Sequence, residues 1–446
     1  MNPRSKTDAD VIVIGGGIAG LGAALRLKDR GLEPLVLEAE SRVGGRMTTD
    51  RVKGFVIDRG VTLLGKGFVR MRALVKRLGL SALACSSNFS VAIEGPSGAR
   101  SYRGVHFEDL LLDPGLSWGD RLAALRFGLE LFLHSRALAH GRSDLGERLD
   151  GEDSLAYFQR IGAAEVFHRV FEPGLNGPVG GSAATSSRII AMQTIWNLLV
   201  RGQWNLTGGL DRIPESIAAQ MRVVTSARVI SVDRYADGVR VEAQINGAQQ
   251  TLQARGVVFA VPGHLVPAMC TCLSEEIRDP LARTRYSEMV NAAVALSAPP
   301  KSPHGGYAFR QDVVSGAAIE LEHLRVPNRC PPGTGMAGVY LWDTPQLRRL
   351  DGDDELIKKQ ASEIVERTFP ECRGKVLFVH LVKWDIAIAQ FPPGRLREIT
   401  ALRNRLATWD APLDFCGDYL DGISSEGALR TGEQAADRLA GKLGKP

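Results

Sequence analysis

The stretch Asp10-Val11-Ile12-Val13-Ile14-Gly15-Gly16-Gly17-Ile18-Ala19-Gly20 decides the fold of this chain. Its apolar, β-branched run predicts a buried parallel strand, and residues 20–30 that follow have helical character. Gly15, Gly17 and Gly20 occupy the three glycine positions of a dinucleotide-binding turn. The first permits a tight turn, the second lets the backbone approach a pyrophosphate, and the third brings helix and strand close together. The phosphates of a ligand would lie on the free N–H groups at the helix N-terminus.

An acidic residue follows at the distance that this motif requires. Residues 34–37 predict a second short strand, and Glu38 stands at its end, about 20 residues after the glycine turn. A carboxylate at this place accepts hydrogen bonds from ribose hydroxyls, so the pattern favours NAD or FAD over NADP. The alternative is an ordinary strand–helix–strand unit without a ligand, and the completeness of the pattern argues against it.

The composition limits the class of protein. With 446 residues the chain is longer than one ordinary domain, so we expect two or three domains. The formal net charge of +5 is small, and no basic stretch is interleaved with aromatic residues, which argues against nucleic acid as a partner. Six scattered cysteines lack metal-ligand spacing, so we predict no metal site and expect free thiols in a reducing compartment. We find no signal-peptide core and no apolar run that would span a bilayer, which favours the cytoplasm.

Two later segments extend the nucleotide-binding pattern. Arg42-Val43-Gly44-Gly45-Arg46 is a flexible backbone that can approach a ligand closely, with cations beside it. A surface turn with solvated charges is the alternative, and the position of the segment just after Glu38 argues against that. Residues 55–58 predict another strand, which leads into Asp58-Arg59-Gly60.

These residues resemble the N-terminal FAD region of the flavin-containing amine oxidase superfamily, which includes monoamine oxidases, protoporphyrinogen oxidases and phytoene-type desaturases. The resemblance returns near the other end of the chain, at residues 413–418 and 424–428. It implies an α/β fold, in which a Rossmann-like FAD-binding domain is built from discontinuous segments. An inserted α+β substrate domain would contain a helical subdomain. The expected FAD-binding domain comprises residues 1–80, 205–285 and 376–446, and the expected substrate-binding domain comprises residues 81–204 and 286–375, with the helical part at about 115–200.

The resemblance also implies which residues hold FAD. The backbone of Gly44 and Gly45 and the side chain of Arg46 would lie near the pyrophosphate, and residues 60–62 would pass near the isoalloxazine ring. The helix that begins near Ser425 would direct its N–H groups at the pyrimidine edge of the flavin, where reduction places negative charge. The implied cofactor-binding set is Gly15, Gly17, Ile18, Ala19, Gly20, Glu38, Ala39, Gly44, Gly45, Arg46, Gly60, Val61, Thr62, Val229, Ala260, Val261, Trp384, Gly417, Asp418, Ser425, Glu426 and Ala428.

Two residues are candidates for a position beside the reacting part of the flavin. Trp384 matches a tryptophan that lies near the flavin in protoporphyrinogen oxidases and desaturases, with a core tryptophan as the alternative. Asn291 is the best match for the lysine that monoamine oxidases carry near flavin N5, with an edge asparagine as the alternative. No cysteine lies between Trp384 and Gly394, where monoamine oxidases attach FAD covalently, so we expect FAD to bind non-covalently. Ser424 stands where those enzymes place the second aromatic residue of an amine cage.

The missing lysine and the missing aromatic residue predict an enzyme of the protoporphyrinogen oxidase or desaturase type. Its expected reaction is FAD-dependent dehydrogenation of a C–N or C–C bond in a small apolar or polycyclic metabolite, with a hydride passing to flavin N5. An amine or amino-acid oxidase that releases an imine and hydrogen peroxide is one alternative. A redox-silent flavoprotein is another. The sequence leaves the substrate, the electron acceptor and the oligomeric state open, a dimer included.

The inserted region carries two further expectations. Residues 119–140 form a long amphipathic stretch with Leu122, Leu125, Leu129, Phe132 and Leu133 on one stripe, and we expect this stripe to pack in the core. Peripheral contact with a membrane surface and the wall of an apolar funnel are the alternatives. Residues 172–181, which are rich in proline and glycine, predict a loop.

Overall fold

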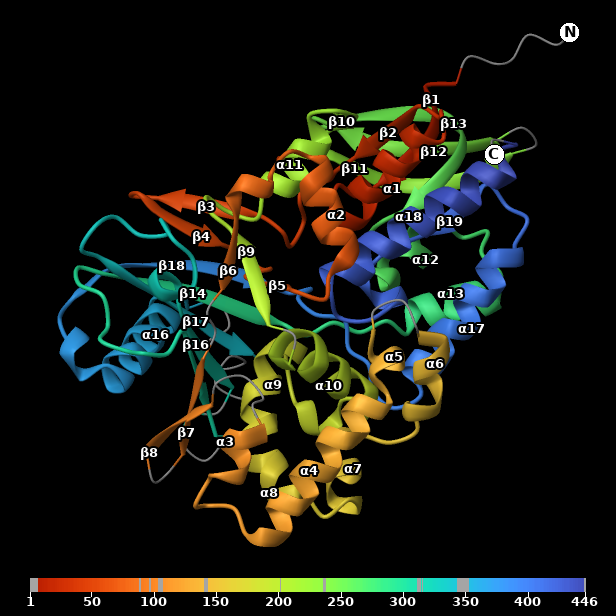
Figure 1. Cartoon of the computed structure of the whole chain (residues 1–446). Helices are drawn as coiled ribbons and strands as arrows, with labels where there is room; N and C mark the ends of the chain where they lie inside the picture. The colour runs from red at the N-terminus through yellow and green to blue at the C-terminus, as the bar shows by residue number, and fades with distance from the viewer. Residues whose placement is uncertain are drawn as a thin grey trace, which may run out of the picture.

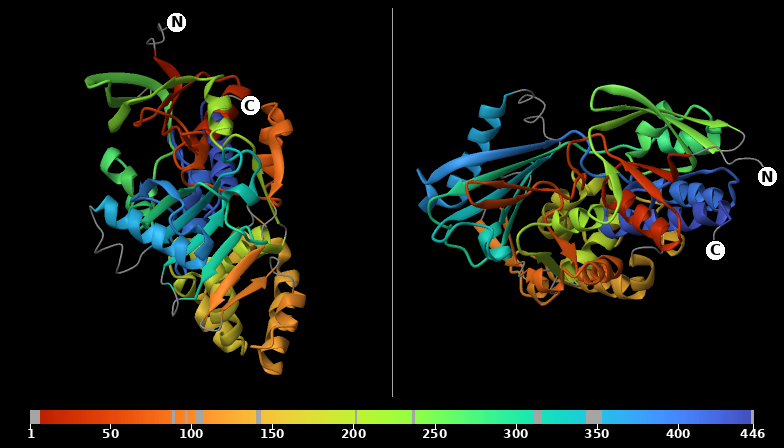
Figure 2. Two further views of the ribbon diagram at one scale, coloured as in Figure 1. Left: turned by 90° about the vertical axis from the view of Figure 1, so that its left-hand side faces the viewer. Right: turned by 90° about the horizontal axis from the view of Figure 1, so that it is seen from above.

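The computed structural model describes residues 7–87, 90–95, 98–102, 107–139, 143–200, 202–235, 238–310, 314, 316–342 and 353–444. Figure 1 shows a first sheet beside both ends of the chain, a second sheet flanked by helix α16, and a helical region at the opposite margin. The views in Figure 2 keep the same arrangement.

The first sheet is the expected Rossmann-like layer. Its central strand β1 runs parallel to both of its neighbours, β2 and β13, and is buried almost throughout because helices cover it. The strand order is β10-β2-β1-β13-β12-β11, and β19 pairs with β13 outside that order. The strands are β1 (Ala9–Ile14), β2 (Pro34–Leu37), β10 (Arg222–Val224), β11 (Ala227–Tyr235), β12 (Gly238–Ile245), β13 (Ala248–Phe259) and β19 (Leu413–Phe415).

Two helices from opposite ends of the sequence pack together beside this sheet. A Cβ atom on Gly22 of α1 would lie 2.6 Å from the Leu429 side chain of α18, and one on Gly432 would lie 2.2 Å from the Ala19 carbonyl oxygen. These glycines therefore let the two helix backbones approach closely. The helices on this part of the molecule are α1 (Ile18–Asp29), α2 (Val69–Arg77), α11 (Arg212–Ala218), α12 (Val266–Met269), α13 (Glu275–Ala282), α17 (Arg395–Thr408) and α18 (Ser425–Lys442).

The sequence Asn246-Gly247 between two strand-like runs predicts a hairpin, and β12 and β13 form it. Asn246 and Gly247 connect the strands with φ angles of 49° and 85°. A two-residue hairpin turn needs positive φ at both positions, which asparagine and glycine tolerate best. The hairpin extends the first sheet away from the glycine turn.

The second sheet is mostly antiparallel, and α16 (Asp354–Thr368) packs its apolar side chains on it. Since β18 pairs with β14 inside this sheet, we propose to place the domain boundary after Trp384 rather than after residue 375. The order is β18-β14-β17-β16-β15-β7-β8. The strands are β7 (Val91–Gly95), β8 (Gly98–Tyr102), β14 (Met289–Leu296), β15 (Gly306–Phe309), β16 (Ala317–Leu321), β17 (Gly335–Trp342) and β18 (Val376–Trp384), and the short helix α14 (Glu322–Arg325) follows β16.

Two small sheets lie along the chain between these larger units. One pairs β3 with β4, and the other has the order β5-β9-β6. The polar residues Asp58 and Asn205, which lie at or near the ends of these strands, are buried. The strands are β3 (Thr49–Val52), β4 (Phe55–Asp58), β5 (Leu64–Gly65), β6 (Ala84–Ser87) and β9 (Gln203–Leu206).

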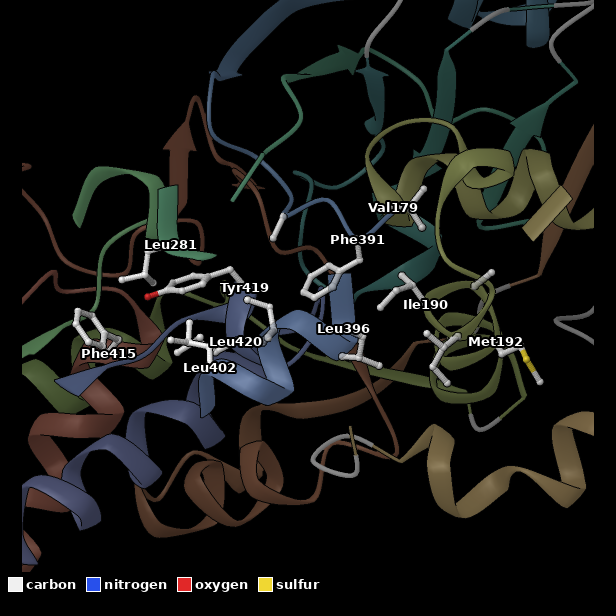
Figure 3. Close-up of a cluster of buried hydrophobic side chains, with 14 of the residues drawn as sticks. Val179, Ile190, Met192, Leu281, Phe391, Leu396, Leu402, Phe415, Tyr419 and Leu420 are labelled. Atoms are coloured by element: carbon white, nitrogen blue, oxygen red, sulfur yellow. The ribbon is translucent and has the colours of Figure 1, made fainter. Parts of the chain in front are cut away.

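The helical region shares one apolar core with the first sheet. Figure 3 shows this core running from Phe415 and Tyr419 past Leu396 and Phe391 to Ile190. The helical region is therefore joined firmly to the nucleotide-binding side. Its helices are α3 (Phe107–Leu111), α4 (Trp118–Leu133), α5 (Ser135–Leu138), α6 (Ser143–Gly146), α7 (Ser154–Arg160), α8 (Ala164–Val166), α9 (Glu172–Val179) and α10 (Arg188–Thr194).

Two expectations about this region are wrong. Residues 172–181 were expected to be a loop, but most of them form α9, which continues directly from helical turns at residues 167–171 and ends at Gly180 with φ 65°. The stripe from Leu122 to Leu133 was expected to face the core, but all five of its residues are exposed. The opposite face of α4 is apolar too, and that face is the one that packs inward.

Candidate active site

The glycine turn has the geometry that its sequence predicts. Gly15 adopts φ 107°, and a Cβ atom there would lie 2.6 Å from the Ala260 carbonyl oxygen. A Cβ atom on Gly20 would lie 2.0 Å from the Gly15 carbonyl oxygen, so this position admits no side chain. Around Gly17, in contrast, a Cβ atom would meet no protein atom within 4 Å. The middle glycine therefore opens onto free space at the start of α1.

Glu38 closes one side of this space. Its carboxylate accepts hydrogen bonds from the Gly16 N–H at 2.6 Å and the Glu40 N–H at 2.8 Å. Burial raises the pKa of Glu38, and these two N–H groups partly offset that effect. Ala39 follows directly, and Val229 lies two residues beyond Ala227, whose N–H donates to the Glu38 carbonyl oxygen at 2.8 Å.

The second glycine segment lies directly against the first. The Gly44 N–H donates to the Gly16 carbonyl oxygen at 2.8 Å, and a Cβ atom on Gly45 would lie 3.4 Å from Gly17 Cα. Val261 contributes a side chain 3.3 Å from the Cβ position of Gly15. The structure thus brings together the residues expected around the adenosine diphosphate half of the cofactor, with Ile18 and Ala19 in the first turn of α1.

Arg46 connects this region to the other end of the chain. Its guanidinium donates to both carboxylate oxygens of Asp418, at 2.8 and 3.0 Å, and to the Ala387 carbonyl oxygen at 2.6 Å. The Arg46 carbonyl oxygen accepts from the Val61 N–H at 3.0 Å, and a Cβ atom on Gly60 would lie 2.6 Å from the same oxygen. Residues 60–61 are therefore held beside Arg46.

The carbonyl oxygen of the next residue, Thr62, accepts hydrogen bonds from two side chains. The Asn205 side chain donates to that oxygen at 2.6 Å, and the Arg325 guanidinium donates to it at 3.2 Å. Both donors are buried. The backbone expected to pass near the flavin ring thus rests on a buried polar cluster.

The N-terminus of α18 has one side-chain cap. Ser424 Oγ accepts from the Gly427 N–H at 3.0 Å, while Ser425 and Ala428 lie in the first turns. The Glu426 carboxylate turns to another helix and accepts from the N–H groups of Arg70 and Met71 at the start of α2. Only the backbone of Glu426 is therefore free to take part in cofactor binding. Gly417 precedes Asp418 with a φ of 153°, which favours glycine, and donates its N–H to the Thr431 hydroxyl.

The two candidate residues for the reaction meet at one carbonyl group. Trp384 Nε1 donates to the Arg59 carbonyl oxygen at 3.0 Å. Asn291 Nδ2 donates to the same oxygen at 3.4 Å and to the Asp58 carbonyl oxygen at 2.9 Å. The strands β14 and β18 place these side chains close together, because Met289 of β14 lies opposite Trp384 of β18.

A buried charged cluster behind residues 58–62 was not foreseen. Arg329 donates to the Asp58 carboxylate at 2.6 Å, and Arg325 donates to Glu322 at 2.8 Å. All four side chains are nearly inaccessible to solvent. Nothing in the sequence distinguishes these charges from surface charges, because only the fold brings them together.

Tyr286 was also missed. The Arg46 guanidinium lies 5.6 Å from the centre of its ring, and burial raises the pKa of its hydroxyl. Among the residues that the structure describes, neither the Tyr286 hydroxyl nor Asn291 Oδ1 has a hydrogen-bond partner. Buried polar atoms without partners are uncommon, and a bound molecule could satisfy them.

These residues fit a dinucleotide cofactor. Gly17 and Gly45 leave room against the backbone, the first turn of α1 has no side-chain cap, and Glu38 is a buried acceptor for hydroxyl groups. Arg46 and the N-terminus of α18 supply positive charge for the other part of the cofactor. The fold and the site together define a dinucleotide-binding protein with an inserted second domain.

The chain belongs to the flavin-containing amine oxidoreductase family, whose model matches residues 18–440. Members of this family are flavin-dependent oxidoreductases, and FAD is the cofactor that the sequence predicts. The α/β fold class is confirmed as well.

Proteins of similar sequence fall into two groups. AofH of Mycobacterium tuberculosis, a candidate flavin-containing monoamine oxidase, is 29% identical over 266 residues. That match covers 57% of this chain and 57% of AofH, so it spans little more than half of that relative. Coproporphyrinogen III oxidase of Bacillus subtilis is 24% identical over 468 residues, with 94% of each chain covered.

Solved structures share the fold over nearly the whole chain. Cyclohexylamine oxidase from Brevibacterium oxydans IH-35A superimposes with a TM-score of 0.77 at 20% identity, covering 98% of this chain and all of that one. A protoporphyrinogen oxidase candidate from Exiguobacterium sp. 255-15 gives 0.75 at 16% identity, covering 99% of this chain. At such low identity these likenesses bear on the fold alone. Among the described residues, no helix has the length and apolar character needed to cross a bilayer.

Proposed function

We propose that this protein uses FAD to dehydrogenate a C–N or C–C bond of a small apolar or polycyclic metabolite, as protoporphyrinogen oxidases and desaturases do. The observation that supports the proposal most directly is the hydrogen bonding of Asn291. Its amide nitrogen is bound to the carbonyl oxygens of Asp58 and Arg59, and the position offers no ammonium group to hold a water near the flavin. The near-complete match to coproporphyrinogen III oxidase supports the same branch of the family.

Ser424 supports the same class of reaction. Its hydroxyl caps α18 by accepting from the Gly427 N–H, so this position supplies a helix cap instead of an aromatic ring. An aromatic ring is the side chain that would hold an amine by its π-face. The chain therefore lacks both features that the resemblance associates with amine oxidation.

We propose that FAD, when bound, accepts a hydride from the substrate C–H bond. The residues of this chain would orient the cofactor and stabilise the charge that develops on it. Glu38 and the glycine turn would hold the adenosine diphosphate half, Arg46 would lie near the pyrophosphate, and the N-terminus of α18 would stabilise negative charge. Asn291 and Trp384 position residues 58–60 by binding the Arg59 carbonyl group from two strands.

Anaerobic mixing of the purified holoprotein with single candidate substrates tests this proposal. We expect coproporphyrinogen III or protoporphyrinogen IX to bleach the visible absorbance of the flavin, and cyclohexylamine and putrescine to leave it unchanged. Bleaching by the amines, with hydrogen peroxide release under air, would establish the amine-oxidase alternative instead. Bleaching by none of these compounds, despite normal reduction by dithionite, would contradict the proposal and favour a redox-silent flavoprotein.

Trp384→Phe and Asn291→Ala each remove a donor to the Arg59 carbonyl group. Because one such hydrogen bond contributes about 1 kcal/mol, we expect each variant to slow the bleaching roughly fivefold to tenfold while FAD remains bound. Unchanged bleaching rates in both variants would show that these residues do not contribute to the reaction.

We also propose that the protein works in the reducing cytoplasm. All six cysteines are free, and the Sγ atoms of Cys270 and Cys272 lie 3.4 Å apart without a bond. Rapid acid quenching of cells followed by thiol labelling should modify Cys270 and Cys272 fully. Protection of both until a reductant is added would contradict this location.

A further inference from the structure

Tyr286 lies where three segments that are expected to bind the cofactor come together. Its ring centre is 5.5 Å from that of His264, which follows the expected cofactor residue Val261 by three positions. The Arg46 guanidinium, which is bound to Asp418, lies 5.6 Å from the centre of the same Tyr286 ring. Tyr286 itself is not in the set of residues that the sequence assigns to FAD.

The backbone fixes Tyr286 beside Arg46. The Ser287 N–H donates to the Ile388 carbonyl oxygen at 3.0 Å, and the Ala387 N–H donates to the Ser287 carbonyl oxygen at 2.8 Å. The Arg46 guanidinium donates to the Ala387 carbonyl oxygen at 2.6 Å. Ala387 therefore holds both Arg46 and the segment that carries Tyr286.

The hydroxyl of Tyr286 is a donor without an acceptor. Its oxygen is inaccessible to solvent, and it has no hydrogen-bond partner among the residues that the structure describes. Burial raises the pKa of this hydroxyl, and the negative charge of Asp418 raises it further, so the proton stays on the oxygen at neutral pH. Since an unpaired buried donor costs free energy, we expect this proton to meet an acceptor that the described part of the chain does not supply.

The neighbouring carboxylate of Asp418 is already engaged. Both of its oxygens accept from the Arg46 guanidinium, and Oδ1 also accepts from the Tyr419 N–H at 3.1 Å. A buried water molecule is one remaining acceptor for the Tyr286 hydroxyl, and a bound cofactor is the other. The position of Tyr286 beside Arg46 and Asp418, both of which the sequence assigns to FAD, favours the cofactor.

We propose that the Tyr286 hydroxyl donates a hydrogen bond to an oxygen atom of the chain that joins the two ring systems of FAD. Arg46 is expected near the diphosphate of that chain, and phosphate oxygens are strong acceptors, while ribityl hydroxyls accept as well. Tyr286 would thus bind the cofactor and take no part in the transfer of hydride. The proposal rests on FAD as the cofactor, and it does not depend on which substrate the flavin oxidises.

Tyr286→Phe removes the hydroxyl and keeps the ring. In the full-length holoprotein, we expect this variant to release FAD about tenfold faster than the parent, because it loses a hydrogen bond to the cofactor. The rise in flavin fluorescence after dilution measures the release. Without FAD, the variant should melt at the temperature of the parent or above it, because the apoprotein loses only an unpaired donor.

Tyr235→Phe is the matched control. The Tyr235 hydroxyl oxygen is also inaccessible to solvent and has no partner in the described part of the chain. Tyr235 lies at the end of β11, six positions beyond Val229, which corresponds to roughly 20 Å along a strand. This variant should release FAD at the rate of the parent.

Two results would overturn the proposal. Release of FAD from Tyr286→Phe at the rate of the parent would leave a buried water molecule as the acceptor. A melting temperature below that of the parent, measured for Tyr286→Phe without FAD, would mean that the hydroxyl has a partner within the protein.

ADP distinguishes between the two kinds of acceptor oxygen, because it carries a diphosphate and no ribityl chain. If the acceptor is a phosphate oxygen, ADP should raise the melting temperature of the apoprotein less in Tyr286→Phe than in the parent. An equal rise in the two proteins would assign the hydrogen bond to the ribityl chain.

Discussion

Arg46 and Asp418 form a bidentate ion pair between residues 372 positions apart in the sequence, with nitrogen–oxygen distances of 2.8 and 3.0 Å. The pair joins the segment that follows the glycine turn to the segment that precedes the last helix. A planar guanidinium that faces a carboxylate in this way fixes orientation as well as charge. The two ends of the cofactor site therefore keep their relative position through this contact.

Asp418→Asn removes the negative charge and keeps the size of the side chain. Because Asp418 is mostly buried and Arg46 is partly exposed, we expect a loss of about 1–3 kcal/mol in the free energy of unfolding of the apoprotein. FAD should bind roughly tenfold more weakly, since Arg46 loses its orientation. Urea unfolding and flavin fluorescence titration measure the two effects.

The matched control for this prediction is Asp437→Asn. Asp437 pairs with Arg26 on the surface, where both side chains are more than a third exposed, so the loss should stay below about 1 kcal/mol. Equal effects of the two substitutions on stability and on FAD affinity would show that the Arg46 pair has no special part in the site.

Gly17 and Gly20 should respond differently to alanine. Gly17→Ala places a methyl group where no protein atom lies within 4 Å, at an ordinary φ of −72°, so the apoprotein should unfold at its usual temperature. FAD affinity should fall at least about tenfold, because the methyl group occupies the approach of the pyrophosphate.

Gly20→Ala serves as the contrast, since its Cβ would lie 2.0 Å from a backbone oxygen. We expect it to lower the melting temperature of the apoprotein by several degrees, as overpacking against the backbone costs about 1–3 kcal/mol. Unchanged FAD binding by Gly17→Ala would mean that the open space beside Gly17 is not used by the cofactor.

Glu322 should make stability depend on pH. Burial raises the pKa of this carboxyl group from 4.5 to about 7, and Arg325 and Arg329 limit the rise. The folded protein holds this proton more tightly than the unfolded chain. Its stabilising contribution is therefore complete below about pH 4.5, shrinks above that pH, and is lost as the pH rises through about 7.

Glu322→Gln should remove this trend, because an amide does not titrate. Relative to the variant, the parent should lose stability progressively as the pH rises from 5 to 7 in urea unfolding. Glu355→Gln changes a carboxylate that is 82% exposed and should keep the pH profile of the parent. Parallel profiles for the parent and Glu322→Gln would contradict the prediction.

Local sequence signals predicted the parts of the fold that local chemistry controls. The glycine turn and the Asn246-Gly247 hairpin each need backbone angles that few residues adopt, so their sequences are nearly specific. The strand before Glu38 was equally clear, because a short apolar run ends there in a carboxylate.

Sequence patterns were harder to interpret where the structure depends on what an element packs against within the protein. The stripe on α4 has the spacing of a core helix, and periodicity alone does not tell which of two apolar faces turns inward. Residues 172–181 contain prolines and glycines, yet most of them continue helical turns that begin earlier in the chain, and Asn176 Oδ1 accepts from the Ala183 N–H just beyond the end of the helix.

Parts of the candidate site were beyond prediction from the chain alone. Charged side chains normally lie on a surface. Those of Asp58, Arg325 and Arg329 are buried, because the fold brings segments that are distant in the sequence together. The carboxylate of Glu426 caps α2, a contact that the sequence does not reveal, so its expected part in cofactor binding falls to its backbone. The role in FAD binding of the residues that the fold does bring together stays a prediction.

The close contact of α1 and α18 has a consequence for how the protein is made. A ribosome that adds about 5–20 residues per second releases α1 some tens of seconds before it reaches α18. During that time Ala19 and Gly22 lack the surface that covers them, and the nascent chain holds an unfinished cofactor site. We therefore expect FAD to associate only after synthesis is complete, so that supply of the flavin acts on released chains and not on growing ones.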